Sequence, residues 1–179
     1  MSATNRGAIR IDKDRYNTPE YATELICRHV NWAEVTSFCE PCRGSNAIWK
    51  VVIRYINNST NMYWYEIDRG RDYLLPNARE NTDIMITNPP YSLAQEFINM
   101  ATTHCTTIIM LLRVNYLGAQ KRREWWQTHL PTHMYVLSER PKFTVNKKGR
   151  LSGDATEYAW FVWETNIRMM RETPGIYVL

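Results

Sequence analysis

Residues 83–92 read DIMITNPPYS, a short apolar run that stops at an amide, two prolines and an aromatic residue. The run predicts a β-strand that enters the core. The two prolines cannot donate a backbone hydrogen bond, so they end the strand and hold the following turn rigid. The stretch therefore predicts a buried strand whose end presents Asn88 and Tyr91 in a fixed loop.

The residue types of this loop suit one kind of chemistry. An amine bonded to an aromatic ring is a poor nucleophile because its lone pair is delocalised, and two acceptors placed on its hydrogens return that pair to the nitrogen. The side-chain oxygen of Asn88 and the backbone oxygen of Pro89 can be these acceptors, and the ring of Tyr91 can stack on an unstacked base. Asn88, Pro89, Pro90 and Tyr91 are therefore candidate catalytic residues, and an ordinary Pro-Pro turn is the alternative.

Strands and helices alternate on both sides of this stretch. Strands are predicted at 35–39, 62–67, 83–87, 106–112, 133–137 and 157–163, and helices at 18–30, 47–56, 93–101 and 117–128. Thr18 is expected to cap the first helix, with Pro19 at its first position. The alternation predicts an α/β domain with a mostly parallel sheet and helices on both faces. The last two strands have no helix between them and should pair antiparallel.

Polar residues follow three of the predicted strands where each strand ends. They are Glu40, Pro41, Cys42 and Gly44 after the first strand, Glu66 and Asp72 after the second, and Asn88 after the third. Ligands of open parallel sheets bind beyond these carboxyl ends. Gly44 allows a close turn against a ligand, Glu66 can accept from ribose hydroxyls, and Glu40 suits a cation or an amino group. Asp72 can accept from the amine of adenine, but each residue alone is also typical of a turn or a solvated surface.

Length and composition limit the class of protein. With 179 residues, 44% of them apolar, the chain can form a complete core, and one domain over 1–179 is expected. No apolar run approaches a membrane span, and the polar first residues do not form a signal peptide, so a cytoplasmic protein is expected. Cys39 and Cys42 form one C-x-x-C, but no second ligand pair completes a zinc site, so reduced thiols and no metal are expected.

Positive charge is concentrated in residues 121–150. This stretch holds eight Lys and Arg residues against two Glu residues, a net +6, which leaves −2 for the rest of a chain whose total is +4. A locally basic face favours a polyanionic partner, and a solvated surface is the alternative. Trp125 and Trp126, in the predicted helix of this region, could stack on bases but are more typical of packing.

Several segments, taken in order, resemble the class I S-adenosylmethionine-dependent methyltransferases, and among them the small phage-type DNA adenine-N6 methyltransferases. The segments are Tyr16-Asn-Thr-Pro19, Phe38-Cys-Glu-Pro-Cys-Arg-Gly44, Glu66, Asp72, Asn88-Pro-Pro-Tyr91, Arg140-Pro-Lys-Phe143 and Tyr158-Ala-Trp-Phe-Val-Trp163. The resemblance implies a Rossmann-like fold, S-adenosylmethionine as cofactor, and methyl transfer to adenine in DNA without a metal. It also implies a bacterial or phage-infected cell, and a catalytic domain without a separate target-recognition domain.

The resemblance gives each matching residue a role. Cofactor contacts are implied for Tyr16, Thr18, Pro19, Glu40, Pro41, Cys42, Gly44, Glu66, Asp72 and Asn88, with Asp68 as a rival to Asp72. Substrate contacts are implied for Tyr91, and phosphate contacts are expected for Arg140, Lys142, Lys147, Lys148 and Arg150.

The chain also departs from the family pattern at two places. Asn46 stands where the family often has a second glycine, and Asn tolerates a left-handed backbone better than most residues. Glu66 and Asp72 are only six residues apart, so the helix that usually separates them should be missing or reduced.

Other functions stay open at this point. Asn-Pro-Pro-Tyr loops also occur in methyltransferases that act on RNA adenines or on glutamine amides of proteins. A protein substrate does not require the basic stretch, whereas DNA or RNA does. The chain could also be a nucleic-acid-binding module that has kept the fold without turnover. Target recognition could use the basic loop, a partner subunit or a second copy in a homodimer.

Overall fold

The computed structural model describes residues 17–75, 80–145, 151–152, 155–165 and 169–179. Its main element is a seven-stranded sheet in the order β2-β1-β3-β4-β8-β5-β9. The strands are β1 (Ser37–Glu40), β2 (Asn61–Trp64), β3 (Thr82–Thr87), β4 (Cys105–Arg113), β5 (His133–Val136), β8 (Tyr158–Glu164) and β9 (Gly175–Val178). They run parallel to one another except for β8, which lies antiparallel between β4 and β5.

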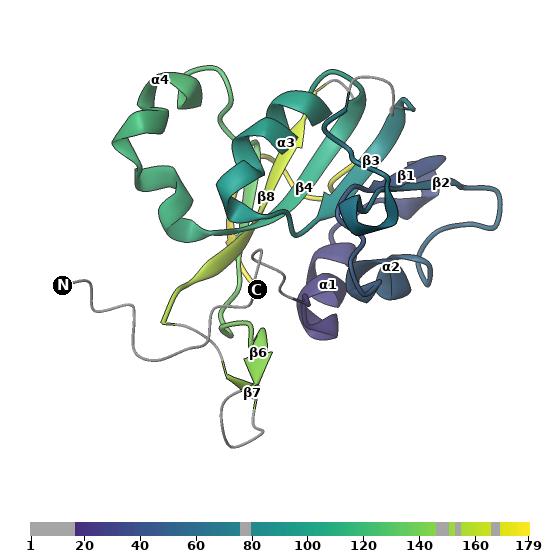
Figure 1. Ribbon diagram of the computed structural model, residues 1–179, viewed down its shortest axis with the longest axis horizontal. Helices are drawn as coiled ribbons and strands as arrows, with labels where there is room; N and C mark the ends of the chain where they lie inside the picture. Colours follow the sequence, from purple (N-terminus) through teal and green to yellow (C-terminus); the bar gives the residue numbers. More distant parts are fainter. Residues whose placement is uncertain (1–16, 76–79, 146–150, 153–154, 166–168) are drawn as a thin grey trace.

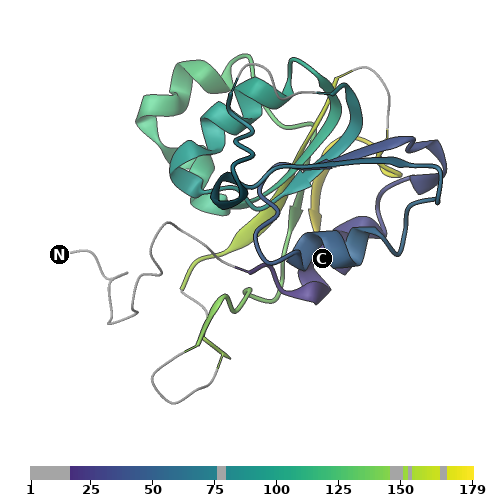
Figure 2. The same ribbon diagram turned by 45° about the vertical axis from the view of Figure 1, so that its right-hand side comes forward.

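Helices cover both faces of this sheet (Figures 1 and 2). The α-helices are α1 (Glu20–Cys27), α2 (Ala47–Val52), α3 (Ala94–Ala101) and α4 (Arg123–Trp126). Short 3-10 turns are η2 (Trp32–Glu34), η3 (Ile67–Arg69), η4 (Tyr91–Leu93), η5 (Val114–Gly118) and η6 (Gln120–Arg122). Helices α1 and α2 lie on one face, α3 and α4 on the other, and the hairpin of β6 (Thr144–Val145) and β7 (Leu151–Ser152) projects from the body (Figure 1).

The apolar residues of the central strands supply both halves of the core. Successive side chains of a strand point to opposite faces. Ile84 and Ile86 of β3 accordingly pack in the cluster with α1 and α2, whereas Met85 packs in the cluster with α3. Fully buried Trp160 of β8 ties the sheet to α1, because its Nε1 donates to the backbone oxygen of Ala22 at 2.9 Å. A strand buried on both faces needs such a continuous apolar sequence.

The predicted fold class is confirmed: an α/β, Rossmann-like, mostly parallel sheet with helices on both faces. The last two predicted strands, β5 and β8, pair antiparallel as expected. The structure adds β9, an edge strand parallel to β5 that the sequence analysis missed. It also adds the β6–β7 hairpin inside the stretch expected to be a basic loop. The single-domain organisation over 1–179 stays a prediction.

Three local predictions were wrong. Thr18 does not cap α1: Pro19 is the N-cap, no side chain caps the helix, and the Thr18 hydroxyl accepts a hydrogen bond from Asn88 instead. The helix expected at 117–128 is broken into η5, η6 and the four-residue α4, because tertiary packing of its aromatic residues decides its shape. The first strand begins at Ser37 rather than at Val35.

The described residues show no metal cluster and no membrane helix. Within them, no group of three or more His, Cys, Asp and Glu side chains could hold a metal ion. No helix of the described part is long and apolar enough to cross a bilayer. All four cysteines are free thiols, and Cys27, Cys39 and Cys105 are buried, as the packing interpretation predicted.

Candidate active site

The catalytic candidate Asn88 lies at the edge of the sheet where the parallel strands end, here called the carboxyl edge. It directly follows β3, and its Nδ2 donates to Oγ1 of Thr18 at 3.1 Å. Thr18 is buried and precedes α1, so a chain segment 70 residues away fixes the orientation of the amide. With Nδ2 directed at Thr18, Oδ1 is the acceptor end of the Asn88 amide.

The loop between β1 and α2 reaches the same place. Gly44 has a φ of 47° and Asn46 a φ of 69°, both in the left-handed region. The prediction that Asn46 can take the conformation of a glycine is therefore confirmed. The Gly44 N–H donates to Oε2 of Glu66 at 2.7 Å, which ties the loop to the end of β2.

A small cavity of about 40 Å³ lies between this loop and Asn88. Its lining residues come from the segment before α1, from the β1–α2 region and from the end of β3: Asn17, Thr18, Glu40, Cys42, Arg43, Gly44, Ser45, Ala47, Ile48 and Asn88. Two of the lining residues bond each other at an exposed position: the hydroxyl of Ser45 donates to Oδ1 of Asn17 at 2.6 Å. Cofactor sites are usually several hundred Å³, so a bound cofactor would extend beyond this cavity.

Glu40 is the most unusual residue of the cavity. Its side chain is 1% exposed, and Oε2 has no hydrogen-bond partner among the described residues. Burial raises the pKa of Glu40 well above its usual range, while the charge of Arg43 and a backbone hydrogen bond from Trp49 oppose that rise. A buried acceptor without a partner is costly, so this atom points to a ligand that supplies a donor.

The other predicted acids gather around Cys42. The pKa of the Cys42 thiol is raised, and burial is the largest cause. The charges of Glu66, Glu40 and Asp72 add to the rise. Asp72 is not among the residues that line the cavity. Its Oδ1 accepts from the Leu74 N–H at 2.9 Å. The expected helix between Glu66 and Asp72 is reduced to the three-residue turn η3, as predicted.

The proline residues of the site keep the chain extended. Pro41 and Pro89 are buried, and Pro19 and Pro90 have extended conformations with ψ angles of 141° and 121°. The backbone therefore turns into α1 and η4 only after a proline in each case. This places Thr18 and Asn88 on stiff segments, which suits a fixed hydrogen bond between them.

Sequence reasoning missed Arg113, which ends β4 next to Tyr91. Its guanidinium carbon lies 5.1 Å from the centroid of the Tyr91 ring, and its Nε donates to the hydroxyl of Tyr158 at 3.2 Å. The rings of Tyr91 and Tyr158 are 6.1 Å apart. The signal was present, because Arg113 directly follows a predicted strand and thus stands at its carboxyl end.

The predicted substrate residues are only partly described. Arg140 and Lys142 are exposed, and each faces a carboxylate: Arg140 pairs with Glu157 through Nε at 3.0 Å, and Lys142 lies 4.0 Å from Glu139. The predicted residues that lie outside the described part are Tyr16, Lys147, Lys148 and Arg150.

Trp125 and Trp126 pack rather than present their rings. Trp126 is buried edge-on against Tyr116 at 5.8 Å between ring centroids. Trp125 stacks on His129 at 4.6 Å and donates from Nε1 to Asn99 at 2.7 Å. These contacts agree with the packing interpretation of both tryptophans.

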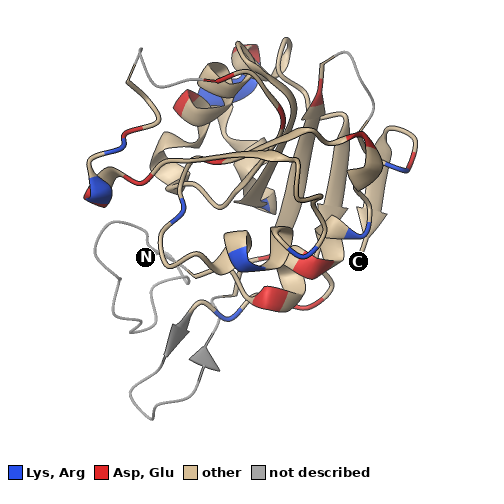
Figure 3. Cartoon of the chain, turned by 90° about the vertical axis from the view of Figure 1, so that its right-hand side faces the viewer, with Lys and Arg blue, Asp and Glu red and all other residues tan. Residues whose placement is uncertain are grey.

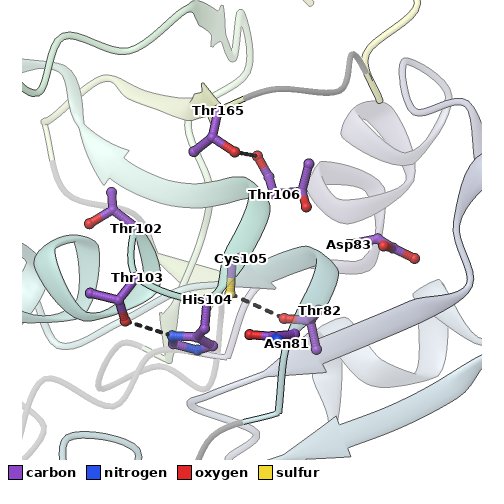
Figure 4. Close-up of a pocket in the computed structure, with 9 residues that line it drawn as sticks. All are labelled: Asn81, Thr82, Asp83, Thr102, Thr103, His104, Cys105, Thr106 and Thr165. Atoms are coloured by element: carbon purple, nitrogen blue, oxygen red, sulfur yellow. Dashed lines mark hydrogen bonds between the residues drawn. The ribbon is translucent and has the colours of Figure 1, made fainter.

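A larger hollow of about 340 Å³ lies at the opposite, amino edge, where β3 and β4 begin (Figure 4). Its walls are the residues Asn81, Thr82, Asp83, Thr102, Thr103, His104, Cys105, Thr106 and Thr165. Figure 4 shows several of these polar groups bonded to one another, among them Thr165 to Thr106 and Thr82 to Cys105. Parallel sheets bind ligands at the carboxyl edge, so we place the candidate site there in spite of the smaller cavity.

No family model and no curated protein sequence matches this chain. Solved structures do. A protein of Pyrococcus horikoshii described as a candidate RNA methyltransferase has a TM-score of 0.63 and 12% identity over 87% of this chain and 88% of that one. A SAM-dependent O-methyltransferase of Thermotoga maritima has a TM-score of 0.55 and 12% identity, covering 91% and 69%. The 23S rRNA methyltransferase ErmE has a TM-score of 0.55 and 10% identity, covering 88% and 73%. At these identities the similarity establishes a shared fold.

Proposed function

We propose that this protein transfers a methyl group from S-adenosylmethionine to the exocyclic amine of adenine in DNA. The observation that carries the proposal is the Asn88 amide. The amide nitrogen donates a hydrogen bond to Thr18, and Asn88 lines the same cavity as Glu40 and Gly44. An amide held in this orientation presents an oxygen acceptor beside the candidate cofactor cavity, as methylation of an amine requires.

The residues of the cavity fit this cofactor. Oε2 of Glu40 would accept from the cofactor's ammonium group, which satisfies a buried oxygen that has no partner among the described residues. Glu66 would accept from the ribose hydroxyls while it holds the Gly44 N–H. The left-handed turn at Gly44 lets the backbone approach without a Cβ in the way. When bound, the cofactor supplies an electrophilic methyl group on a positively charged sulfur.

The remaining chemistry belongs to residues of the chain. The Asn88 side-chain oxygen and the Pro89 backbone oxygen accept the two amine hydrogens and stabilise the charge that develops on nitrogen. Tyr91 holds the base, and Arg113 fixes the Tyr91 ring from the end of β4. Positioning and electrostatics supply the rate, so neither a covalent intermediate nor a strong base is needed.

RNA adenine is the second candidate substrate. Two of the similar structures are described as RNA methyltransferases. Their descriptions support a nucleic-acid substrate but do not distinguish DNA from RNA. A glutamine amide in a protein and a module without turnover stay as the remaining alternatives. Target recognition by a second copy or a partner subunit stays a prediction.

The test is methyl transfer from labelled S-adenosylmethionine to single-stranded DNA, duplex DNA, RNA and protein extract, each assayed separately. Digestion and mass spectrometry of the product should show N6-methyladenine, and the DNA arm should exceed the RNA arm. Label in protein alone would overturn the nucleic-acid assignment. Cofactor binding without transfer to any of the four would overturn the enzymatic proposal.

A further inference from the structure

Three arginines surround one tryptophan at the end of β2. The guanidinium carbons of Arg43, Arg69 and Arg71 lie 4.9, 5.7 and 4.2 Å from the centroid of Trp64. Arg43 also lies 4.1 Å above the ring of Trp49. We call Trp64 and these three arginines the arginine cluster. Cation–π contact stabilises each guanidinium here and holds it near an aromatic ring.

The backbone holds the cluster in place. Glu66 and Arg71 form an antiparallel bridge, with N–H to oxygen distances of 2.8 and 3.1 Å in the two directions. Gly70 takes a φ of 71° and makes the tight turn inside that bridge possible. The Arg43 N–H donates to the backbone oxygen of Tyr65 at 3.0 Å. The three side chains therefore converge from two short, fixed loops.

The three guanidinium groups of the cluster form no ion pair in the described part of the chain, although the charge of Glu40 acts on Arg43. None of the ion pairs found there uses Arg43, Arg69 or Arg71. Burial lowers the pKa of Arg43, the charge of Glu40 opposes this shift, and the charges of Arg69 and Arg71 add to the lowering. The buried Arg43 Nε also lacks a hydrogen-bond partner among the described residues. Like charges at such short range are unfavourable unless an anion joins them.

The cluster lies on the flank of the carboxyl edge away from the basic stretch. Along that edge the order is β2, β1, β3, β4 and β8, so the catalytic loop after β3 stands between the cluster and Arg140. Neighbouring strands are about 4.8 Å apart, which puts the cluster roughly 10 Å from the end of β3. Figure 3 shows basic and acidic positions interspersed on the β2 side of the molecule. The grouping on Trp64, rather than net charge, therefore distinguishes this place.

We infer that the arginine cluster binds phosphates of the nucleic-acid strand that carries the target base. This inference rests on the proposed function and adds a second phosphate-binding surface to it. A guanidinium held over an indole keeps the N–H donors at its own edge available, where they can reach two phosphate oxygens at once. Arg69 and Arg71 are exposed, so their outer edges are open to a strand. The strand would cross the catalytic loop with one phosphate contact on each side.

The test is binding of a fluorescent single-stranded oligonucleotide, measured by anisotropy between about 50 and 200 mM salt. The double variant Arg69→Ala/Arg71→Ala should flatten the slope of log affinity against log salt by about 1.4, because each lost phosphate contact on a single strand contributes about 0.7. Arg28→Ala is the control for the loss of a surface charge outside the cluster. It removes one exposed positive charge at the far end of α1 and should leave the slope unchanged.

A charge-retaining variant separates stacking from charge. Arg69→Lys/Arg71→Lys keeps both positive charges but loses the flat, forked donors, so the slope should stay while affinity falls severalfold. A slope that is unchanged in the double alanine variant, or that falls equally in Arg28→Ala, overturns the inference. Equal thermal midpoints for all variants would show that each is folded.

The two proposals fail in different measurements. If the wild-type protein methylates nucleic acid and the double alanine variant keeps the wild-type salt slope, only the inference about the arginine cluster is overturned. If the wild-type protein transfers no methyl group and the double alanine variant has a flattened slope, only the proposed enzymatic function is overturned. The arginine cluster then remains as a nucleic-acid-binding surface.

Discussion

The two edges of the parallel sheet differ in how their polar groups are satisfied. At the amino edge, Oδ2 of Asp83 accepts from the Thr36 N–H, the Thr36 hydroxyl and the Ser37 N–H at 2.7 to 2.9 Å. The Ser37 hydroxyl in turn accepts from the Asp83 N–H at 2.8 Å. At the carboxyl edge, Oε2 of Glu40 is buried without a partner among the described residues.

The size of a hollow is therefore a poor guide to function in this molecule. The amino-edge hollow is the larger one, but its groups bond one another and stabilise the sheet. The carboxyl edge has the smaller cavity, yet it combines a left-handed turn, an oriented amide and a buried acceptor. Buried polar groups that the chain itself leaves unsatisfied mark where a ligand is expected.

The largest expected effect comes from deleting the acceptor at the carboxyl edge. Asn88→Ala should lower the rate of methyl transfer by about 10²–10³-fold, or roughly 3–4 kcal/mol, because the lost hydrogen bond is strongest in the transition state. The dissociation constant of the cofactor, measured by calorimetry, should change little. Asn81→Ala is the matched control at the amino edge, where the same deletion should leave the rate unchanged. A parallel loss in both variants would contradict the distinction between the edges.

The next effect concerns Glu40. Glu40→Gln should weaken cofactor binding by about 10- to 100-fold, because a charge-assisted hydrogen bond contributes roughly 1.5–3 kcal/mol. Calorimetry with S-adenosylmethionine measures this change directly. An affinity equal to that of the wild type would mean that Oε2 does not face the ammonium group.

The same substitution should change the pH dependence of stability without ligand. Burial raises the pKa of Glu40 in the folded protein, so its contribution to stability is complete below the unfolded pKa and is lost as pH rises through the folded pKa. The wild type should therefore lose thermal stability relative to Glu40→Gln as the pH rises above the pKa that the Glu40 carboxyl has in the unfolded chain. A difference in thermal midpoint between the wild type and Glu40→Gln that is the same at all pH values would exclude a raised pKa of Glu40.

At the amino edge the expected effect is on stability alone. Asp83→Ala removes the acceptor of three hydrogen bonds and should lower the free energy of unfolding by about 1–3 kcal/mol. Burial disfavours the charged carboxylate, but the hydrogen bonds from Thr36 and Ser37 outweigh it and lower the pKa of Asp83. This stabilisation is present above the unfolded pKa and is lost as pH falls through the folded one. Urea titration measures the free energy of unfolding, and the cofactor affinity should stay unchanged in Asp83→Ala.

The smallest effect is expected at Arg113. Arg113→Met keeps most of the side-chain volume but removes the cation from the Tyr91 ring, a contact that contributes about 0.5–1 kcal/mol at exposed sites. Methyl transfer should fall about two- to fivefold with unchanged cofactor affinity. Arg113→Lys should recover part of the loss. A rate equal to the wild type in both variants would remove Arg113 from the positioning of Tyr91.

Sequence reasoning predicted the sheet well because its central strands are apolar throughout. The runs in β3, β4 and β8 are buried on both faces, so their sequence alone determines where they lie. Short edge elements gave weaker signals. The strand β9 has the sequence Gly-Ile-Tyr-Val, and its Ile176 and Val178 are each 74% exposed, so burial did not shape it.

The candidate site was predictable at positions where the residue type favours one local conformation or one chemical role. The Asn88 loop and the left-handed Asn46 followed from composition and backbone preference. The Thr18 cap failed because a hydroxyl before a proline can serve a cap or a distant side chain equally well, and only the fold brings Asn88 to it. The arginine cluster depends on three arginines meeting at Trp64 from two loops, which no sequence spacing reveals.

The position of β8 between β4 and β5 has a consequence for the order of assembly on the ribosome. Strands β1 to β4 can pair as soon as they are made, because their partners precede or directly follow them. β5 has only β8 and β9 beside it in the sheet, so it must wait until residue 164 has left the exit tunnel. A nascent chain stopped before Tyr158 would pair β4 with β3 but leave the other edge of β4 exposed, and an exposed strand edge is prone to aggregation.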